Sequence, residues 1–424
     1  MAAMIADAGP TRIEHPSRPS QPAQLMLDLL RDGEHAPPRP AEQIEAFLDW
    51  RRRNKIALLV LAGRCPLWLA ADPTFAAALD AEGARYQTQR DEYLRVRDAW
   101  QARGIDCLMI KPAGNPPSFP HTSDNIDILV RPADGLRARE TLRQLGYVEI
   151  RNVEEPQKFL FRRFHGGRCV LAIHVHERIA WFVGFLDDAR VWERSAPAPD
   201  DPAVRIPSPE DAILINLAHA CYENKELRLV EVLRVRHALT AAGESLDWHY
   251  MDEIATGRGW RDGLAFMLLV HAYAEQSLFG ETLIPDTVLT RCEETLAGDR
   301  AMLNRLDEIQ AAELNDLPLD LSYLFCKRLY YRKILRDPAS DRQRRLRDVA
   351  ATLIWGVKLK SGLRPQPAMV VSISGPDGSG KTAHAKHLVA AIRLCELRAN
   401  DVWYRGGSSN LFRLLSHRPR HTSR

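Results

Sequence analysis

The segment VVSISGPDGSGKTAHAKHLVAA, residues 370–391, decides the fold expected for the C-terminal part of the chain. It begins with β-branched residues, continues with the glycine-rich residues 375–382, and ends with apolar residues at helical spacing. Residues 375–382 match G-x-x-x-x-G-K-T, which forms a phosphate-binding loop when it follows a strand and opens a helix. The sequence therefore predicts a strand, a loop and a helix in this order.

The residue types in this loop suit the phosphates of ATP. Glycines let the backbone curve until its N–H groups point at one centre, and a helix N-terminus adds partial positive charge. Lys381 can reach the β- and γ-phosphates, and the Thr382 hydroxyl can ligate Mg²⁺. The predicted cofactors are therefore ATP and Mg²⁺, and the predicted binding residues are Gly375, Gly378, Ser379, Gly380, Lys381 and Thr382. The alternative is a glycine-rich turn that opens an ordinary helix.

With its Asp377-Gly378 pair, the loop resembles that of thymidylate-kinase-like nucleotide kinases. The resemblance covers about residues 368–415 and implies transfer of a phosphoryl group from ATP, with Lys381 and Asp377 as catalytic residues. It places Asp377 near the sugar hydroxyl of an acceptor nucleotide. It also implies that Arg405, at the end of a strand expected over residues 400–405, contacts the acceptor's phosphate.

The chain ends at Arg424, so few residues follow Lys381. A complete P-loop fold needs several more strands, which also supply an acidic Mg²⁺ partner and catalytic cations. We therefore expect residues 368–424 to form a truncated, incomplete βαβ unit that lacks the C-terminal kinase region. Such a unit should have little or no turnover alone.

The middle of the chain predicts a small mixed α/β domain. Strand-like runs cover residues 105–110, 125–130 and 147–150, and a hairpin is expected around Gly166-Gly167. Lys111, the Asn125–Val130 segment and the later Ser208-Pro209-Glu210-Asp211 helix start resemble nucleotidyltransferases of the DNA polymerase beta type. The resemblance covers about residues 50–280. It implies that carboxylates on one strand face hold Mg²⁺ and makes Asp127 a catalytic metal ligand and Lys111 a phosphate contact.

Two positions differ from the pattern of these nucleotidyltransferases. Asn125 stands where the first carboxylate is expected, and His174 stands where the third is expected, so Asp127 alone keeps a carboxylate. The domain is therefore interpreted as degenerate. His174 and His176 share one face of a strand, because side chains alternate along it. They could be hydrogen-bonded groups, or they could join Asp127 in binding a transition metal.

The expected fold class is α/β plus α: a small mixed-sheet nucleotidyltransferase-like domain, a helical domain and the incomplete P-loop unit. The predicted boundaries are a disordered tail at 1–40, an α/β domain with N-terminal helices at 41–207, and a helical domain at 208–362. Helices are expected over residues 42–63 and 74–104. The basic stretch Lys327–Arg347 is either a solvated helix face or a phosphate-facing surface.

Composition narrows the class of protein. The 58 basic and 55 acidic residues nearly balance, which does not indicate specific nucleic-acid binding. The 7 cysteines are scattered singly, which supports neither a disulfide framework nor a zinc motif. No apolar run is long enough for a membrane span or a signal peptide. The expected location is the cytoplasm.

The main hypothesis from the sequence is an ATP-binding, P-loop nucleotide kinase-like protein. It would transfer a phosphoryl group from ATP and Mg²⁺ to a nucleotide or small-molecule acceptor, and it is fused to the degenerate nucleotidyltransferase-like domain. One alternative is an active nucleotidyltransferase that modifies a protein or small molecule through Asp127. Another is a non-catalytic nucleotide-binding scaffold.

Overall fold

The computed structural model describes residues 20–32, 39–61, 65–111, 125–150, 157–181, 183–311, 317–361, 371–394 and 399. The chain divides into two compact units, one of residues 1–165 and 169–364, and one of residues 166–168 and 365–424. The first unit contains a mixed sheet and most of the helices, and the second contains the glycine-rich segment.

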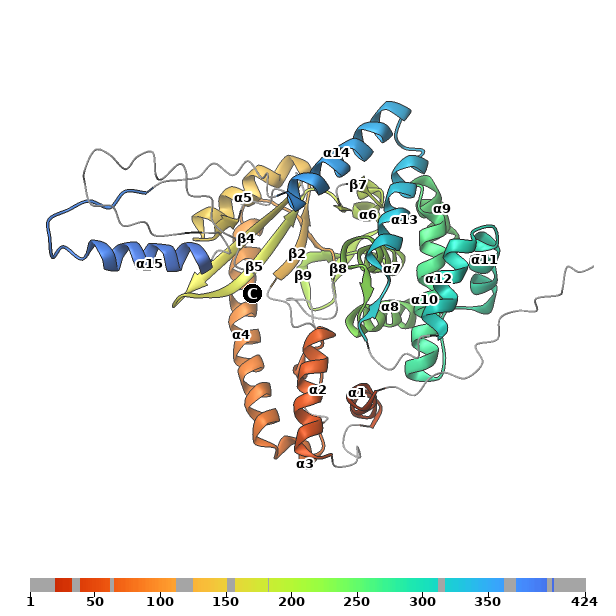
Figure 1. Ribbon diagram of the computed structural model, residues 1–424, viewed down its shortest axis with the longest axis horizontal. Helices are drawn as coiled ribbons and strands as arrows, with labels where there is room; N and C mark the ends of the chain where they lie inside the picture. The colour runs from red at the N-terminus through yellow and green to blue at the C-terminus, as the bar shows by residue number, and fades with distance from the viewer. Residues whose placement is uncertain are drawn as a thin grey trace, which may run out of the picture. The chain divides into compact units, whose positions relative to one another are not determined.

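A seven-stranded mixed sheet is the centre of the first unit (Figure 1). Its strand order is β3-β4-β5-β2-β1-β9-β8. The strands are β1 (Cys107–Met109), β2 (Asn125–Val130), β3 (Val148–Ile150), β4 (Lys158–His165), β5 (Arg168–His176), β8 (Ala196–Ala198) and β9 (Asp201–Ile206). β2 runs antiparallel to β1 and parallel to β5. The expected hairpin at Gly166-Gly167 is confirmed, and both glycines have positive φ, as a tight turn between strands requires.

The side chains of the central strands alternate between two apolar cores. Ile126, Ile128 and Val130 of β2 face a core shared with the helices α4 (Pro73–Gln101) and α5 (Gly135–Gln144). Leu129 faces a larger core on the other side. Because side chains alternate along a strand, Asn125 and Asp127 share the side of Leu129.

Helices that precede the sheet strands in the sequence and helices that follow them pack together in the larger core. They are α1 (Gln21–Asp32), α2 (Ala41–Arg53), α3 (Leu67–Ala70), α6 (Asp188–Arg194), α7 (Pro209–Ala218), α8 (Leu229–Ala242), α9 (Trp248–Gly257), α10 (Arg261–Phe279), α11 (Asp286–Leu296), α12 (Arg300–Ala311) and α13 (Tyr323–Arg336). α10 is buried on almost every face and contacts α7, α11 and α12. Short strand pairs, β6 (Ala180–Trp181) with β7 (Val183–Gly184) and β10 (Glu226–Leu227) with β11 (Leu319–Asp320), complete the unit.

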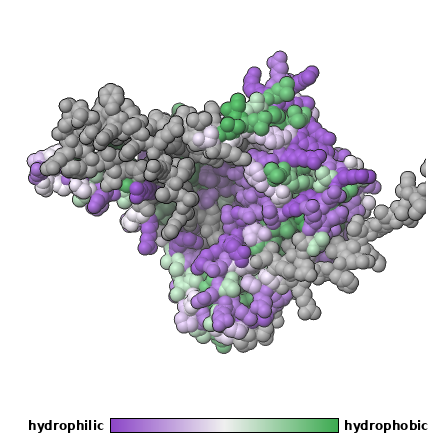
Figure 2. Space-filling view, in the orientation of Figure 1, coloured by the Kyte–Doolittle hydropathy of each residue, from purple (hydrophilic) through white to green (hydrophobic). Residues whose placement is uncertain are grey.

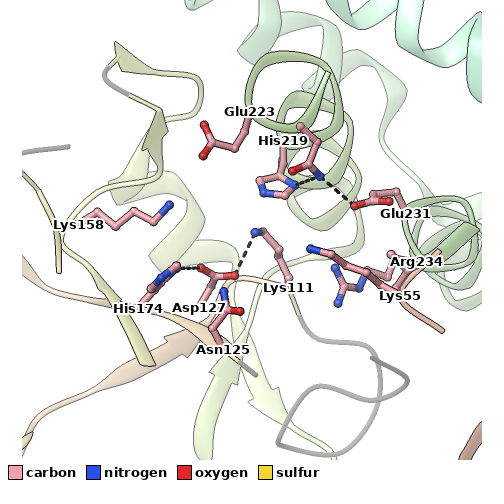
Figure 3. A pocket seen from close by; sticks show the side chains of 12 residues that line it. Lys55, Lys111, Asn125, Asp127, Lys158, His174, His219, Glu223, Glu231 and Arg234 are labelled. Atoms are coloured by element: carbon pink, nitrogen blue, oxygen red, sulfur yellow. Dashed lines mark hydrogen bonds and ion pairs between the residues drawn. The ribbon is translucent and has the colours of Figure 1, made fainter. Parts of the chain in front are cut away.

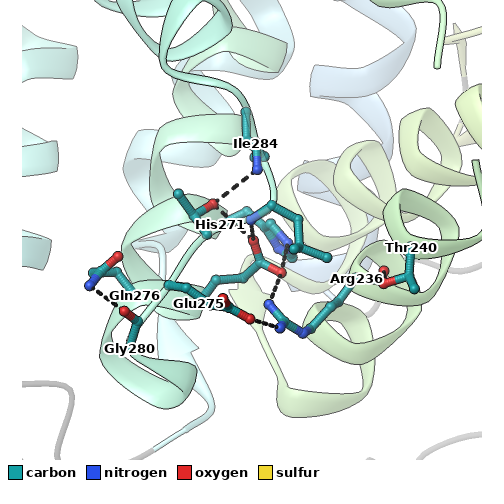
Figure 4. A network of polar contacts seen from close by, with 10 residues as sticks. Arg236, Thr240, His271, Glu275, Gln276, Gly280 and Ile284 are labelled. Atoms are coloured by element: carbon teal, nitrogen blue, oxygen red, sulfur yellow. Dashed lines mark hydrogen bonds and ion pairs between the residues drawn. The ribbon is translucent and has the colours of Figure 1, made fainter. Parts of the chain in front are cut away.

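A buried ionic network fixes α10 against its neighbours (Figure 4). Glu275 is fully buried; one carboxylate oxygen accepts a hydrogen bond from Arg236 at 3.1 Å and lies 3.6 Å from His271 Nε2. The other accepts from the Thr282 hydroxyl at 2.9 Å and from the Leu283 N–H at 3.0 Å. Burial alone would raise the pKa of Glu275, but His271 and the Leu283 and Thr282 donors lower that pKa to about 2.

We expect Glu275→Gln to destabilise the fold by about 3 kcal/mol at neutral pH, because it removes a charge whose partners stay buried. The folded-state pKa lies below the unfolded value, so this stabilisation is present above about pH 4.5. It is lost as the pH falls toward 2. Urea unfolding of both proteins at several pH values measures the difference, which should shrink over that range. A constant difference would contradict the assignment.

Part of the basic stretch Lys327–Arg347 serves the packing of the helices. Lys333 is buried and lies 2.7 Å from Asp337, while Arg332 pairs with Asp262 and Asp299. The next helix, α14 (Arg342–Lys360), instead exposes apolar side chains, and Figure 2 shows a hydrophobic patch over it. The patch includes Leu353, Ile354 and Val357.

In the second unit the predicted helix is confirmed as α15 (Lys381–Leu394), and Ala385, Val389 and Ile392 form its less exposed face. The predicted strand before the loop is wrong for residues 371–375, which have no regular structure. Val371 and Ile373 are more than a third exposed. A strand needs a hydrogen-bonding neighbour, and these residues pair with no strand in the described part of the chain.

Two predictions for the N-terminal region are corrected. Residues 21–32 of the predicted disordered tail form α1, whose Leu25, Met26 and Leu29 are buried against α2. The prediction used the average composition of residues 1–40, in which the many prolines and arginines outweigh the apolar residues of this helix. The helix expected over 42–63 ends at Arg53, and a 3₁₀ turn, Leu58–Leu61, follows.

None of the described helices combines the length and the apolar composition needed to cross a bilayer. The six cysteines in the described ranges are thiols, four of them buried.

Candidate functional site

A polar pocket lies between the sheet and the helices of the first unit (Figure 3). Its volume is about 190 Å³, far above the about 10–15 Å³ that one water requires. Strands β2, β4 and β5, the turn His219–Asn224 and the start of α8 surround it, together with Lys55 and Lys111. The lining residues are Lys55, Lys111, Asn125, Asp127, Lys158, His174, His219, Glu223, Asn224, Val230, Glu231 and Arg234.

Asp127 is the centre of the sheet side of the pocket. Its Oδ2 lies 3.0 Å from Lys111 Nζ, and its Oδ1 lies 3.0 Å from both His174 Nδ1 and His176 Nε2. Burial would raise the pKa of Asp127, but Lys111 and the two histidines hold it well below its usual value. Burial lowers the pKa of His176 to about 4, so this imidazole is neutral at physiological pH.

The register of two neighbouring strands produces this cluster. Asp127 of β2 pairs with His174 of β5, and His176 is two residues further along β5. Since side chains at i and i+2 point to the same face, all three converge without any loop contribution. The sheet therefore positions the cluster rigidly.

The helical side of the pocket comes from an irregular turn. Residues His219–Asn224 form η4, a π-helix that continues from α7. Such turns widen a helix by one residue and are frequent at functional sites. Here the turn directs Glu223 toward the pocket, as Figure 3 shows.

Asn224 sets the protonation of His219. The Asn224 amide nitrogen lies 3.1 Å from His219 Nδ1 and 3.2 Å from a Glu231 oxygen. Because an amide nitrogen only donates, Nδ1 accepts and the ring proton stays on Nε2. Burial, with Lys111 nearby, holds the pKa of His219 well below its usual value. His219 is therefore a neutral hydrogen-bond donor at Nε2.

More cationic side chains than carboxylates line the pocket. Burial, with Arg228 and Lys111 nearby, lowers the pKa of Lys55. Burial, with Lys158 nearby, lowers the pKa of Lys111 despite Asp127. Burial also lowers the pKa of Arg234, whose buried Nε–H donates to no acceptor within the described ranges. An anion bound among these groups would relieve their desolvation and mutual repulsion.

The structure brings together some of the residues that the sequence singled out. Asp127 and Lys111, predicted as metal ligand and phosphate contact, lie side by side, and His174 and His176 join them. Lys55, Lys158, His219, Glu223 and Arg234 had not been predicted. The SPEDAILINLAH segment contains His219, but its position in a widened turn has no sequence pattern. Arg405 lies outside the described residues.

The glycine-rich segment forms a curved turn in the second unit. Gly378 and Gly380 have positive φ, and Lys381 Nζ donates to the carbonyls of Gly375 and Pro376 at 2.7 and 2.6 Å. Lys381 Nζ also lies 3.7 Å from a carboxylate oxygen of Asp377. Ser379 lies in this turn, and Thr382 is the second residue of α15.

Comparison with known proteins bears on the first unit. The model of a family described as uncharacterised nucleotidyltransferase matches residues 40–274. No curated protein matches the chain. Among solved structures, the antibiotic-resistance factor ANT(2'')-Ia is similar, with 14% identity, a TM-score of 0.30, and coverage of 40% of this chain and 90% of that one. A TM-score this low does not establish a common fold.

The family match includes every residue of the pocket and supports the nucleotidyltransferase hypothesis over the kinase hypothesis. The P-loop assignment stays a prediction. Since the match extends over more than half of the 424 residues, the chain belongs to this family of uncharacterised nucleotidyltransferases.

Proposed function

We propose that the pocket around Asp127 binds the triphosphate of a nucleoside triphosphate such as ATP, and that a nucleotidyl group is transferred from it to a small-molecule or protein acceptor. The observation that carries this proposal is the concentration of half-buried cations, Lys55, Lys111 and Arg234, around one concave polar space. Cations that are partly removed from water without enough counter-charge favour a polyanionic ligand.

Each group has a role in such a transfer. An acceptor oxygen forms a bond to the α-phosphorus while the bond from this phosphorus to the bridging oxygen breaks, and pyrophosphate leaves. Lys55 and Arg234 neutralise the leaving pyrophosphate, and His219 Nε2–H donates to a phosphate oxygen. Glu223, on the pocket side of η4, accepts the proton of the acceptor hydroxyl.

The Mg²⁺ that the family resemblance implies is not matched by the donors present. Mg²⁺ prefers oxygen ligands in an octahedral arrangement. Of the three groups that converge at the sheet, only Asp127 offers oxygen, while His174 and His176 offer nitrogen. Asn125 has an amide where the first carboxylate of the strand is expected. The roles given to the side chains above therefore involve no step through Mg²⁺.

We expect Lys55→Ala and Arg234→Ala each to weaken ATP binding by about tenfold or more, because each removes a charge-assisted contact to phosphate. Calorimetric titration of the full chain with a non-hydrolysable ATP analogue measures this. Arg291→Ala, an exposed arginine on α11, is the matched control and should bind normally. Equal affinity in all four proteins would contradict the pocket assignment.

A second candidate is phosphate binding at residues 375–382, with phosphoryl transfer from ATP to a nucleotide or small metabolite. It is favoured by the turn that ends at the first residue of α15 and by the position of Lys381 over the turn's carbonyls. In this candidate Lys381 contacts the β- and γ-phosphates, Thr382 contacts Mg²⁺, and Asp377 lies near the acceptor. Lys381→Ala in the same titration distinguishes the two sites, because it leaves the pocket of the first unit unchanged.

A further inference from the structure

Asp127, His174 and His176 form a set of three metal-ligating side chains in the described part of the chain. Their ligand atoms all lie within 4.8 Å of one another. We propose that these three residues bind one divalent first-row transition ion, of the series from Mn²⁺ to Zn²⁺, in preference to Mg²⁺.

The spacing of the donor atoms fits a shared ion. Zinc lies about 2.0–2.2 Å from imidazole nitrogen and carboxylate oxygen, so two donors on one ion are about 3.0–3.4 Å apart at angles of 90–109°. Asp127 Oδ1 lies 3.0 Å from His174 Nδ1 and 3.0 Å from His176 Nε2. An ion bound to Asp127 Oδ1 and to either imidazole nitrogen can therefore replace the hydrogen bond between them.

The chemistry of the donors selects the class of ion. Imidazole suits zinc, copper, iron and nickel, whereas carboxylates, carbonyls and water suit magnesium. Two histidines with one carboxylate leave open coordination positions, as in catalytic metal sites. Lys111 holds the second oxygen of Asp127 at 3.0 Å and so orients the carboxylate from behind.

The open side of this site faces the pocket. Asp127 and His174 line the pocket, while His176 lies deeper and is 5% exposed. The remaining positions of a bound ion would therefore be directed at the space between Lys158 and His219 (Figure 3). This last step rests on the proposed function: a phosphate oxygen of the bound nucleotide would complete the coordination of the ion.

The test uses the full chain without an affinity tag, stripped of metal with EDTA and dialysed. Co²⁺ is added with no nucleotide present, and binding is followed by its visible absorption. We expect one Co²⁺ per chain that a large excess of Mg²⁺ does not displace. His176→Ala and His174→Gln should each weaken Co²⁺ binding by about 100-fold or more, beyond the effect of losing an outer-shell partner.

His237→Ala is the matched control, because His237 is exposed on α8 and distant in sequence from the ligands. It should bind Co²⁺ as the parent does. His174 is only partly buried, so His174→Gln should fold even if the change at buried His176 does not. Absence of Co²⁺ binding in the parent, or unchanged binding in His174→Gln, would overturn the proposal. Either result leaves the ATP titrations of Lys55 and Arg234 variants interpretable, because those measure the phosphate site separately.

Discussion

Replacing Asp127 by Ala is expected to destabilise the metal-free chain by about 3 kcal/mol, the lower end of the cost of breaking a buried ion pair, because Lys111 and Asp127 are 14% and 11% exposed. The substitution leaves the Lys111 ammonium in a buried site without its carboxylate partner, and it removes the acceptor of both His174 and His176. Urea unfolding in the presence of EDTA measures the loss without a contribution from bound metal.

Lys111→Met in the Asp127→Ala background provides the control. It replaces the unpaired ammonium with an apolar chain of similar length, so most of the lost stability should return. The four proteins of this cycle give the coupling free energy between Lys111 and Asp127 directly. If the double variant is as unstable as the sum of the single variants, the two residues do not interact and Lys111 does not orient the carboxylate.

The sheet side of the site was predictable from the sequence because its geometry is local and regular. The alternation of side chains in Asn125–Val130 places Asp127 on one face, and the same rule places His174 and His176 on one face of their strand. The family resemblance placed His174 on a strand near Asp127, but the parallel pairing of β2 with β5 that brings them together is seen only in the structure.

The helical side of the pocket was not predictable in the same way. Glu223 and Asn224 line the pocket from η4, which has a π-type hydrogen-bonding pattern that apolar periodicity does not reveal. Lys55 follows α2 with a positive φ of 54°, and its approach to Arg234 depends on contacts between segments far apart in the chain. Such contacts come from tertiary packing, on which propensity and periodicity carry no information.

The motif of the glycine-rich segment predicted the turn and the helix but not the absence of a strand before them at residues 371–375. The residues that define the turn are local, so the positive φ of Gly378 and Gly380 and the helix from Lys381 follow from the sequence. A strand depends on a partner, and the run that includes Val371 and Ile373 has none in the described part of the chain. A motif therefore predicts its own turn better than the sheet around it.

The two sides of the pocket supply different kinds of groups. The sheet supplies the donors that could hold an ion, fixed by strand pairing. The segments after α2 and within α8 supply cations for phosphate, Lys55 and Arg234. We therefore expect a change of the residues on the sheet to leave Lys55 and Arg234 in place.

The double variant Asn125→Asp/His174→Asp is expected to change the preferred ion. Asn125 and Asp127 are two residues apart on one strand face, and His174 pairs with Asp127, so the new carboxylates join Asp127 in one cluster. Because carboxylate oxygens suit Mg²⁺ and imidazole suits later transition ions, Mg²⁺ affinity should rise and Co²⁺ affinity should fall, each by about tenfold or more. Titration of the metal-free protein with each ion, without nucleotide, measures both changes.

Added negative charge alone would also attract Mg²⁺. The variant Asn224→Asp distinguishes this effect of charge from coordination by the new carboxylates. Asn224 lines the same pocket from η4, away from the ligands on β2 and β5, so its replacement adds charge without adding a ligand to the cluster. A purely electrostatic effect would raise the affinity for Mg²⁺ and Co²⁺ together in Asn224→Asp. Coordination predicts opposite changes for the two ions in the double variant. If both ions bind the double variant more tightly, the sheet residues attract cations by charge and do not select them by ligand type.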